Sequence, residues 1–393
     1  MSYVMSELPA LWAETRGDRR ICIAVLDAPI DLHNPSLADA AIEQIFRSRD
    51  SVHKPCGISH GTEVASVIFG RHDGSVQGIS PECRGVSIPI FDCWPDGQPS
   101  ARQADLAHAI RVALAAGVQI INVSAGQLVP HLDAERELFE AVRECVARRV
   151  LVVAAAGNDG CDCLHVPAAL PSVLTVGAMN SHGQALEESN WGSAYQRQGI
   201  LAPGENVLVV SPDGNSIPKN GTSYATAIVS GVAGLLLSRQ LQRGRQADPL
   251  QIREALLKTA IGCDKLAGED CRRLLAGRLN VLGAIAYLDH WSNTKMDESN
   301  DFIETRATEA LAEPKFFPSI GVNATEPLEG RYAGRVVPDG RKSVDSSQSA
   351  AIQPAACSAC RGERELVYAL GQLGHDFGTE ACLDAFKQRM RLL

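Results

Sequence analysis

The sequence predicts an α/β protein with a mostly parallel central sheet. Over residues 1–290, short continuous apolar runs alternate with amphipathic stretches of helical length, a pattern typical of consecutive βαβ units. The runs are continuous, as expected for strands that helices cover on both faces. With 393 residues and 45% apolar side chains, the chain has enough material for one large core.

Individual elements follow from these runs. The expected strands are apolar and bounded by charged or turn residues, at 21–26, 118–124, 150–156, 172–179 and 205–212. The expected helices are longer, at 101–117, 133–149, 223–241 and 248–260, and the third of these is apolar enough to be buried. Helices between successive strands favour parallel pairing, because a parallel connection must cross the sheet.

Composition changes near residue 290. Residues 291–353 are polar and rich in Pro, Ser and Gly, so we expect a linker or long loop region. Residues 354–393 are expected to form a short C-terminal segment with two short helices around Gly378. The predicted organisation is therefore one large domain at 1–290, followed by the polar region and the C-terminal segment.

Charge and hydropathy restrict the partners. There are 37 basic and 46 acidic residues, a formal charge of −9 with no basic run, which argues against a nucleic-acid partner. The apolar stretches fall far short of the roughly 20 residues that cross a membrane. The first 20 residues lack the basic and apolar regions of a signal peptide. We therefore expect a cytoplasmic protein that acts away from membranes.

Twelve cysteines are many for such a chain. Several fall in close pairs whose spacing permits disulfides or a metal clip: Cys83/Cys93, Cys161/Cys163, Cys263/Cys271 and Cys357/Cys360. Because the chain is long and lacks an export signal, we expect buried or half-buried free thiols instead. Cys357 and Cys360, with His375 and Cys382 nearby, make half of a zinc pattern, but no second Cys-x-x-Cys completes it. No metal site is predicted.

Three residues stand where chemistry is commonly placed. Asp27 ends the first expected strand, at the carboxyl edge of the sheet where open α/β folds bind ligands. His60 opens an apolar-periodic helix, and Ser223 follows a Gly-bounded turn at the start of the buried helix. Each alone is explained as a turn or cap residue. Together they supply a nucleophile, a base and a carboxylate to orient the base, and Asn158, just past a strand, supplies an amide donor for an oxyanion.

The motifs around these residues resemble the subtilisin-like serine proteases. They read LDAPIDLHNPSL around Asp27, SHGTEVASVIFG around His60, AAAGND around Asn158 and NGTSYATAIVSG around Ser223. Their order is the one in that family, and the segment 277–285 resembles its closing Gly-x-x-Asn motif. The resemblance covers roughly residues 18–290. It implies a three-layer α/β fold and an acyl-enzyme mechanism.

The resemblance also implies a role for each residue. Ser223 is the nucleophile, His60 the general base and then acid, Asp27 the orienting carboxylate, and Asn158 a donor of the oxyanion hole. Two segments with small side chains line the S1 groove and bind substrate as an added strand. They comprise Ser124, Ala125 and Gly126, and Ala154, Ala155, Ala156 and Gly157. No cofactor is required; subtilisins often bind Ca²⁺ for stability, but no loop here matches such a site residue by residue.

A narrower resemblance is to the proteases that mature cyanobactins (the PatA/PatG type). It lies at 26–32, 122–127, 223–229 and above all 368–380, a segment resembling the start of their C-terminal domain. Ala227-Ile228 and Ala28-Pro29 replace the Pro-His and Thr-Gly of degradative subtilisins, which leaves the catalytic residue types intact. The substrate implied is a ribosomally made precursor peptide.

Two activities occur in that group, leader removal and macrocyclisation. The cyclases carry a helical insertion between Asp and His, whereas His60 follows Asp27 by 33 residues, with only 40–49 as a helix candidate. The expected activity is therefore hydrolysis that removes a leader. The alternatives are a general intracellular protease, a macrocyclase and a non-catalytic module that binds peptide.

Overall fold

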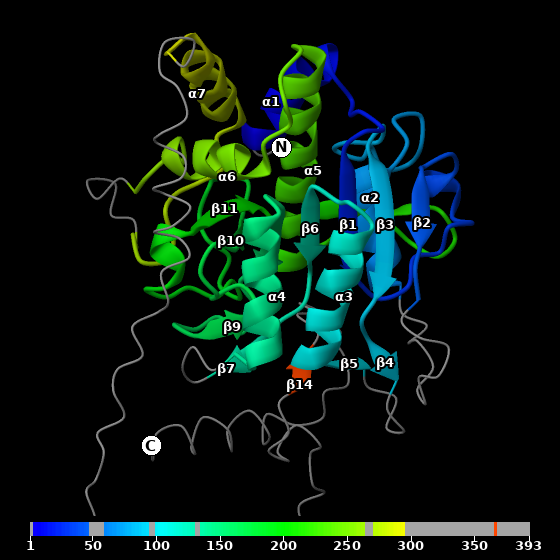
Figure 1. The fold of residues 1–393 in the computed structure, drawn as a ribbon, viewed down its shortest axis with the longest axis vertical. Helices are drawn as coiled ribbons and strands as arrows, with labels where there is room; N and C mark the ends of the chain where they lie inside the picture. The colour runs from blue at the N-terminus through cyan, green and yellow to red at the C-terminus, as the bar shows by residue number, and fades with distance from the viewer. Residues whose placement is uncertain are drawn as a thin grey trace, which may run out of the picture. The chain divides into compact units, whose positions relative to one another are not determined.

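Seven parallel strands form the central sheet, in the order β11-β10-β8-β6-β1-β3-β2 (Figure 1). They are β1 (Cys22–Asp27), β2 (Ile42–Gln44), β3 (Arg84–Pro89), β6 (Ile120–Val123), β8 (Leu151–Ala155), β10 (Leu174–Met179) and β11 (Gly199–Pro203). The computed structural model describes residues 3–46, 59–93, 99–129, 134–263, 270–294 and 365–367. The predicted α/β fold with a mostly parallel sheet is confirmed.

Helices cover both faces of the sheet. They are α1 (Tyr3–Glu14), α2 (His60–Phe69), α3 (Gln103–Ala115), α4 (Arg136–Ala147), α5 (Thr222–Gln242), α6 (Pro249–Lys258) and α7 (Val281–Thr294). α3 and α4 pack together on one face, and α2 and α5 pack together on the other (Figure 1). Every residue of α5 from Thr222 to Gln240 is buried, so its apolar sequence is that of a core helix.

Smaller antiparallel sheets lie beside this core. They are β12 (Val207–Val210) with β13 (Ser216–Lys219), β7 (Gln127–Val129) with β9 (Leu164–Val166), and β4 (Asp92–Cys93), β5 (Pro99–Arg102) and β14 (Glu365–Val367) in the order β14-β5-β4. Four of the five predicted strands therefore lie in the central sheet, and the fifth, at 205–212, is β12. Two 3₁₀ turns, Pro35–Leu37 and Tyr195–Arg197, complete the described elements.

Two expectations about local structure are wrong. Residues 42–44, inside the helix candidate 40–49, form edge strand β2, because Ile42, Glu43 and Gln44 pair with β3. Residues 365–367, placed in a C-terminal helix, form β14, which pairs with β5. The other residues of the C-terminal segment lie outside the described residues.

The chain divides into two compact units, Met1–Arg306 with Arg364–Gly378, and Ala307–Glu363 with Thr379–Leu393. The second unit lies outside the described residues. The predicted boundary at 290 falls inside α7, which runs to Thr294. The polar region expected at 291–353 is beyond the described ranges except for the end of that helix.

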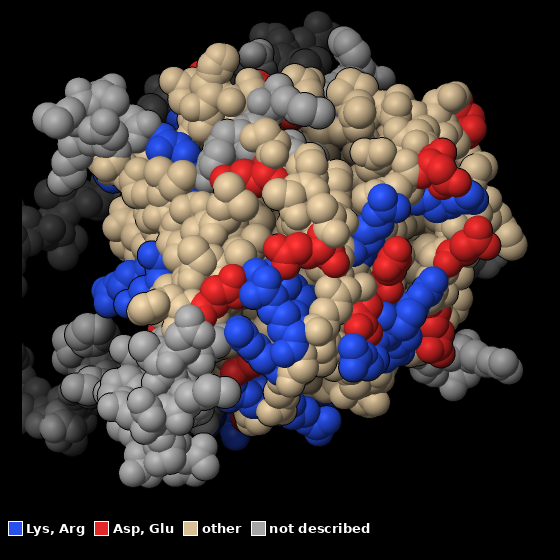
Figure 2. Space-filling model, turned by 90° about the horizontal axis from the view of Figure 1, so that it is seen from above, with Lys and Arg blue, Asp and Glu red and all other residues tan. Residues whose placement is uncertain are grey.

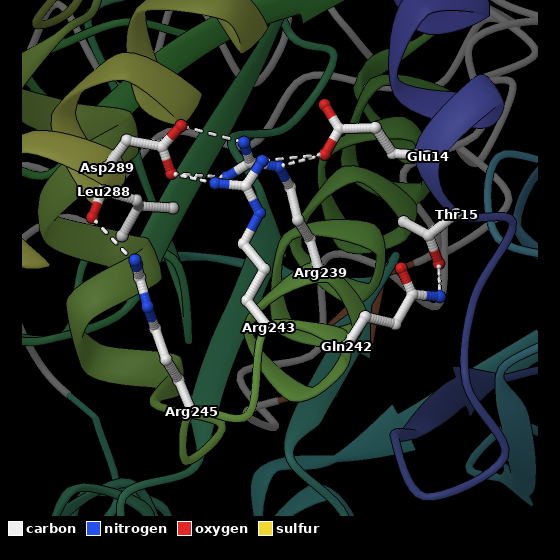
Figure 3. A network of polar contacts seen from close by, with 8 residues as sticks. All are labelled: Glu14, Thr15, Arg239, Gln242, Arg243, Arg245, Leu288 and Asp289. Atoms are coloured by element: carbon white, nitrogen blue, oxygen red, sulfur yellow. Dashed lines mark hydrogen bonds and ion pairs between the residues drawn. The ribbon is translucent and has the colours of Figure 1, made fainter.

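A buried arginine joins three helices at one end of the first unit (Figure 3). Arg239 of α5 donates to Glu14 of α1 at 2.8 Å and to both carboxylate oxygens of Asp289 of α7 at 2.7 and 2.8 Å. Arg243, one turn later, donates to the same two carboxylates. Because α1 and α7 belong to opposite ends of the first unit's sequence, this network fastens both to the core helix.

The face seen in Figure 2 carries Lys and Arg side chains interspersed with Asp and Glu, rather than a broad area of one sign. Among the described helices, none is long and apolar enough to span a bilayer.

Candidate active site

Asp27 and His60 form a buried pair at the carboxyl edge of the sheet. Asp27 is the last residue of β1, and His60 is the first residue of α2. The Nδ1 atom of His60 lies 2.8 Å from Oδ1 and 3.1 Å from Oδ2 of Asp27, and the two side chains are 3% and 0% exposed. An ionised carboxylate only accepts hydrogen bonds, so the proton of a neutral imidazole is held on Nδ1 and Nε2 becomes the basic nitrogen.

Ser223 lies in the first turn of α5 and is buried. The turn before it depends on Gly221, whose φ of 140° is unfavourable for other residues. The rings of His60 and Tyr224, the residue after Ser223, have centroids 5.6 Å apart. The first turns of the two packed helices, which carry the predicted base and the predicted nucleophile, therefore lie near each other.

Asn158 follows β8 and is anchored at one end of its amide. Its Oδ1 accepts hydrogen bonds from the backbone N–H of Thr222 at 2.9 Å and from the Thr222 hydroxyl at 3.0 Å. Because Oδ1 is taken by Thr222, the residue before Ser223, the Nδ2 group is the end of the Asn158 side chain that can donate. The N–H of Ser223 is among the first amides of α5. Both predicted oxyanion donors thus come from the same corner of the site.

The two predicted wall segments leave neighbouring parallel strands. The first segment, residues 124–126, comes directly after β6. The second, residues 154–157, comprises the last two residues of β8 and the two that follow. β6 and β8 are neighbours in the sheet, with Val123 opposite Ala154. All seven wall residues are buried. A chain of hydrogen bonds runs from the Ser230 hydroxyl through Asn122 and the Ser124 hydroxyl to the backbone carbonyl of Ser223. Residues 124–126 and 154–157 are called the predicted S1 walls below.

A buried carboxylate that was not among the predicted site residues, that of Glu63, lies beside His60. Glu63 is one turn into α2 and 3% exposed. It accepts hydrogen bonds from the Tyr224 hydroxyl and the Ser59 hydroxyl, each at 2.7 Å. Burial, and then the charge of Glu63, raise the pKa of the Tyr224 phenol above its ordinary value, so the hydroxyl stays protonated and donates. The signal available beforehand was the Glu in His-Gly-Thr-Glu, on the same helix face as His60.

A second pair that the sequence did not indicate is Asp159 and His165. Their spacing suggested no partnership, but the loop between β8 and β9 brings Asp159 Oδ2 within 2.7 Å of His165 Nε2. Asn190 adds a hydrogen bond to the same oxygen at 2.8 Å. Partial burial raises the pKa of Asp159, but the hydrogen bonds and the imidazole outweigh it and hold that pKa below its usual range.

Two of the four cysteine pairs form disulfides, contrary to the expectation of free thiols. Cys161 is bonded to Cys163 and Cys263 to Cys271, because the folded loops bring their Cα atoms within 5.2 and 5.3 Å. Cys22, Cys83 and Cys145 are free and buried. The pair Cys357/Cys360, with His375 and Cys382, lies outside the described residues.

One group of metal-ligating side chains gathers within the described ranges. Atoms of Asp159, Cys161 and Cys163 lie within 4.8 Å of one another. The two cysteines are joined in a disulfide, and only the thiolate is a metal ligand. The oxidised loop therefore offers one carboxylate, which already binds His165.

Comparisons with known proteins bear on the family and the fold. A model of the subtilase family matches residues 18–301. The solved structure of the prenylagaramide maturation protease PagA is 48% identical, with a TM-score of 0.66 over 72% of this chain and 98% of that one. The patellamide maturation protease PatA is 49% identical, with a TM-score of 0.64 over 70% and 98%. The PatG macrocyclase, solved in complex with peptide, is 30% identical, with a TM-score of 0.64 over 72% and 95%.

Curated sequences add a more general similarity. The thermophilic serine proteinase of Bacillus sp. (strain AK1) is 30% identical over 280 residues, a match that spans 70% of this chain and 64% of that relative. The family match covers the whole central sheet, both core helices of the site, and the four residues Asp27, His60, Asn158 and Ser223. This chain therefore belongs to the subtilase family.

Proposed function

We propose that this chain is a serine endopeptidase that hydrolyses a peptide bond in a ribosomally made precursor peptide and so releases its leader. The observation that carries the chemistry is the buried 2.8 Å contact between Asp27 and His60 beside the start of α5. PagA and PatA are maturation proteases, and their 48% and 49% identity to this chain supports the substrate class. The peptide bound to PatG supports a peptide ligand for this fold.

In the proposed mechanism, Ser223 Oγ attacks the carbonyl carbon of the scissile bond. His60 Nε2 takes the hydroxyl proton, and Asp27 stabilises the resulting imidazolium through Nδ1–H. The oxyanion of the tetrahedral intermediate accepts hydrogen bonds from Asn158 Nδ2 and the Ser223 N–H. His60 then returns the proton to the leaving amine, and water deacylates the enzyme by the same steps in reverse order. These steps require no cofactor.

Hydrolysis is favoured over cyclisation by two observations. The interval between Asp27 and His60 contains a 3₁₀ turn and edge strand β2 in its described part, residues 28–46, rather than a helix. Identity is also higher to the two maturation proteases, at 48% and 49%, than to the macrocyclase, at 30%. A cyclase must protect the acyl-enzyme from water, and this described stretch adds no helical cover.

The test is mass spectrometry of a candidate precursor peptide, encoded beside this protein, after incubation with the wild type and with Ser223→Ala. One cut whose two products together gain one water, absent with Ser223→Ala and present with the exposed control Ser216→Ala, is the expected result. A product that lacks the added water would show cyclisation. Broad digestion of casein with an intact precursor would instead indicate a general protease.

A further inference from the structure

Strand β14, from the C-terminal part of the chain, holds the edge of β5 that β4 leaves open. The pairing is antiparallel, in a register that runs from Glu365 opposite Arg102 to Val367 opposite Ser100. Ser100 and Ala101 of β5 are buried. An open strand edge presents unpaired N–H and C=O groups to any extended segment that can reach it. Here a segment from far along the same chain has taken that place.

The same strand lies beside β7, so it stands between β5 and β7 (Figure 1). β7 begins at Gln127, directly after residues 124–126, the first of the predicted S1 walls. One edge of β7 is paired with β9. The side of β7 on which β14 lies is therefore the side left for another strand, in line with the wall.

A substrate strand that extends beyond this wall would meet β14. The wall leads to the proposed nucleophile, because the Ser124 hydroxyl donates to the backbone carbonyl of Ser223 at 3.2 Å. A peptide added as a strand along residues 124–126 needs about three more residues, at about 3.3 Å each, to run along β7 as well. Because β9 occupies the other edge of β7, this longer peptide and β14 exclude each other.

The bound strand is short and tethered. β14 has three residues, so few backbone hydrogen bonds hold it, and a longer peptide can displace it. It is joined to the end of α7 through residues 295–364, so after displacement it competes again at a high effective concentration. A competitor of this kind weakens substrate binding and leaves the chemistry at Ser223 unchanged.

We propose that β14 is an internal competitor of the substrate, an autoinhibitory strand that keeps long extended peptides from the groove until one of them displaces it. This inference rests on the proposed protease function. A reagent that needs only the surroundings of Ser223 is not affected by β14. A precursor peptide that runs past residues 124–126 is affected, through KM.

The variant that tests this carries Leu366→Pro and Val367→Pro and is called the proline pair. Successive N–H groups of a strand point to opposite edges, so replacing both removes a donor towards β5 in either phase of the ladder. The isoleucine pair, Leu366→Ile with Val367→Ile, keeps both N–H groups and favours a strand, so it is the matched control. The glycine pair at the same positions weakens the strand more gently, should the proline pair fail to fold.

Two measurements on the full chain follow. For the precursor peptide that tests the proposed function, the proline pair should lower KM by about 5- to 10-fold with kcat unchanged, because the competent state is then fully populated. Labelling of Ser223 by a small alkyl fluorophosphonate should keep its rate. Separately, a fluorescein-labelled peptide of residues 361–371, RGERELVYALG, should bind the proline pair at least about 10-fold more tightly than the isoleucine pair in fluorescence anisotropy, with Ser223→Ala in both to prevent cleavage.

Each other outcome overturns the proposal. Equal KM and equal peptide affinity in the proline and isoleucine pairs would show that β14 does not compete. Proline and glycine pairs that label normally but lose peptide cleavage would make β14 a part of the substrate site, and failure of both to fold would make it a structural strand. A folded wild type that neither labels nor cleaves removes the proposed function alone, since the anisotropy measurement needs no catalysis and still reports whether β14 exchanges.

Discussion

The hydroxyl of Tyr224 donates a hydrogen bond of 2.7 Å to the buried carboxylate of Glu63. Tyr224 follows Ser223 on α5, and Glu63 lies one turn after His60 on α2, so this bond ties the two helices that carry the proposed nucleophile and base. Lys219 is 4.0 Å from the other carboxylate oxygen. The bond therefore fixes the relative position of the two first turns.

Tyr224→Phe removes the donor and keeps the ring. Because a buried carboxylate then loses a partner, we expect the free energy of unfolding to fall by about 1.5–3 kcal/mol and kcat/KM to fall several-fold. Chemical denaturation and initial rates measure the two effects. Glu63→Gln, whose amide oxygen still accepts from Tyr224, should cost less; equal losses in both variants would contradict this account.

Asp27→Asn should lower kcat by about 10⁴-fold at neutral pH, because an amide that donates to Nδ1 holds the imidazole in the wrong tautomer. Steady-state kinetics with the cleaved peptide measures the change. The matched control is Asp31→Asn, four residues away, whose exposed carboxylate accepts a hydrogen bond from the N–H of His33. If Asp27→Asn cleaved the peptide at the wild-type rate, Asp27 would be excluded as the orienting carboxylate.

Asn158→Ala removes one proposed oxyanion donor. We expect kcat to fall by about 100- to 1,000-fold with little change in KM, since the donor acts on charge that develops in the transition state. The rate of peptide cleavage under saturating and limiting substrate separates kcat from KM. Asn215→Ala, an exposed asparagine, serves as the control, and a loss confined to KM would assign Asn158 to ground-state binding instead.

The arginine network predicts a pH-dependent contribution to stability. Hydrogen bonds from Arg239 hold the pKa values of Glu14 and Asp289 below their ordinary range. A carboxylate whose pKa is lower in the folded chain stabilises the fold above its unfolded pKa, and this contribution is lost as the pH falls through its folded pKa. The loss of this stabilisation should therefore begin near pH 4.5, the ordinary pKa of a glutamate side chain, and grow on further acidification.

Arg239→Met tests this contribution. At pH 7 we expect a loss of about 1–2 kcal/mol in the free energy of unfolding, a value discounted because both carboxylates are partly exposed. The difference in the free energy of unfolding between this variant and the wild type, measured from denaturation curves, should shrink below pH 4.5. Arg243→Met removes the more exposed of the two arginines and should cost less; a gap that stays constant down to pH 3 would argue against an ionic origin.

Much of the fold could be predicted from the chain itself. Strands β1, β6, β8 and β10 and helix α5 are buried on all sides, so their sequences are continuous apolar runs. Other elements carry no such signal. β3 begins with Arg84 and Gly85, so this strand depends on its pairing with β1. α1 contains Pro9, so this helix depends on its packing against α7.

The sequence by itself determined which residues are proposed for the chemistry. Asp27 ends a strand, Asn158 follows one, and His60 and Ser223 stand in the first turns of helices, each within a local motif. Only the tertiary structure decided the partners of Glu63 and His165 and which cysteines join. Glu63 and Tyr224 are 161 residues apart, and hydrogen bonds and disulfides depend on a few ångströms of separation in space. Such distances are set by packing between elements, which a linear pattern does not encode.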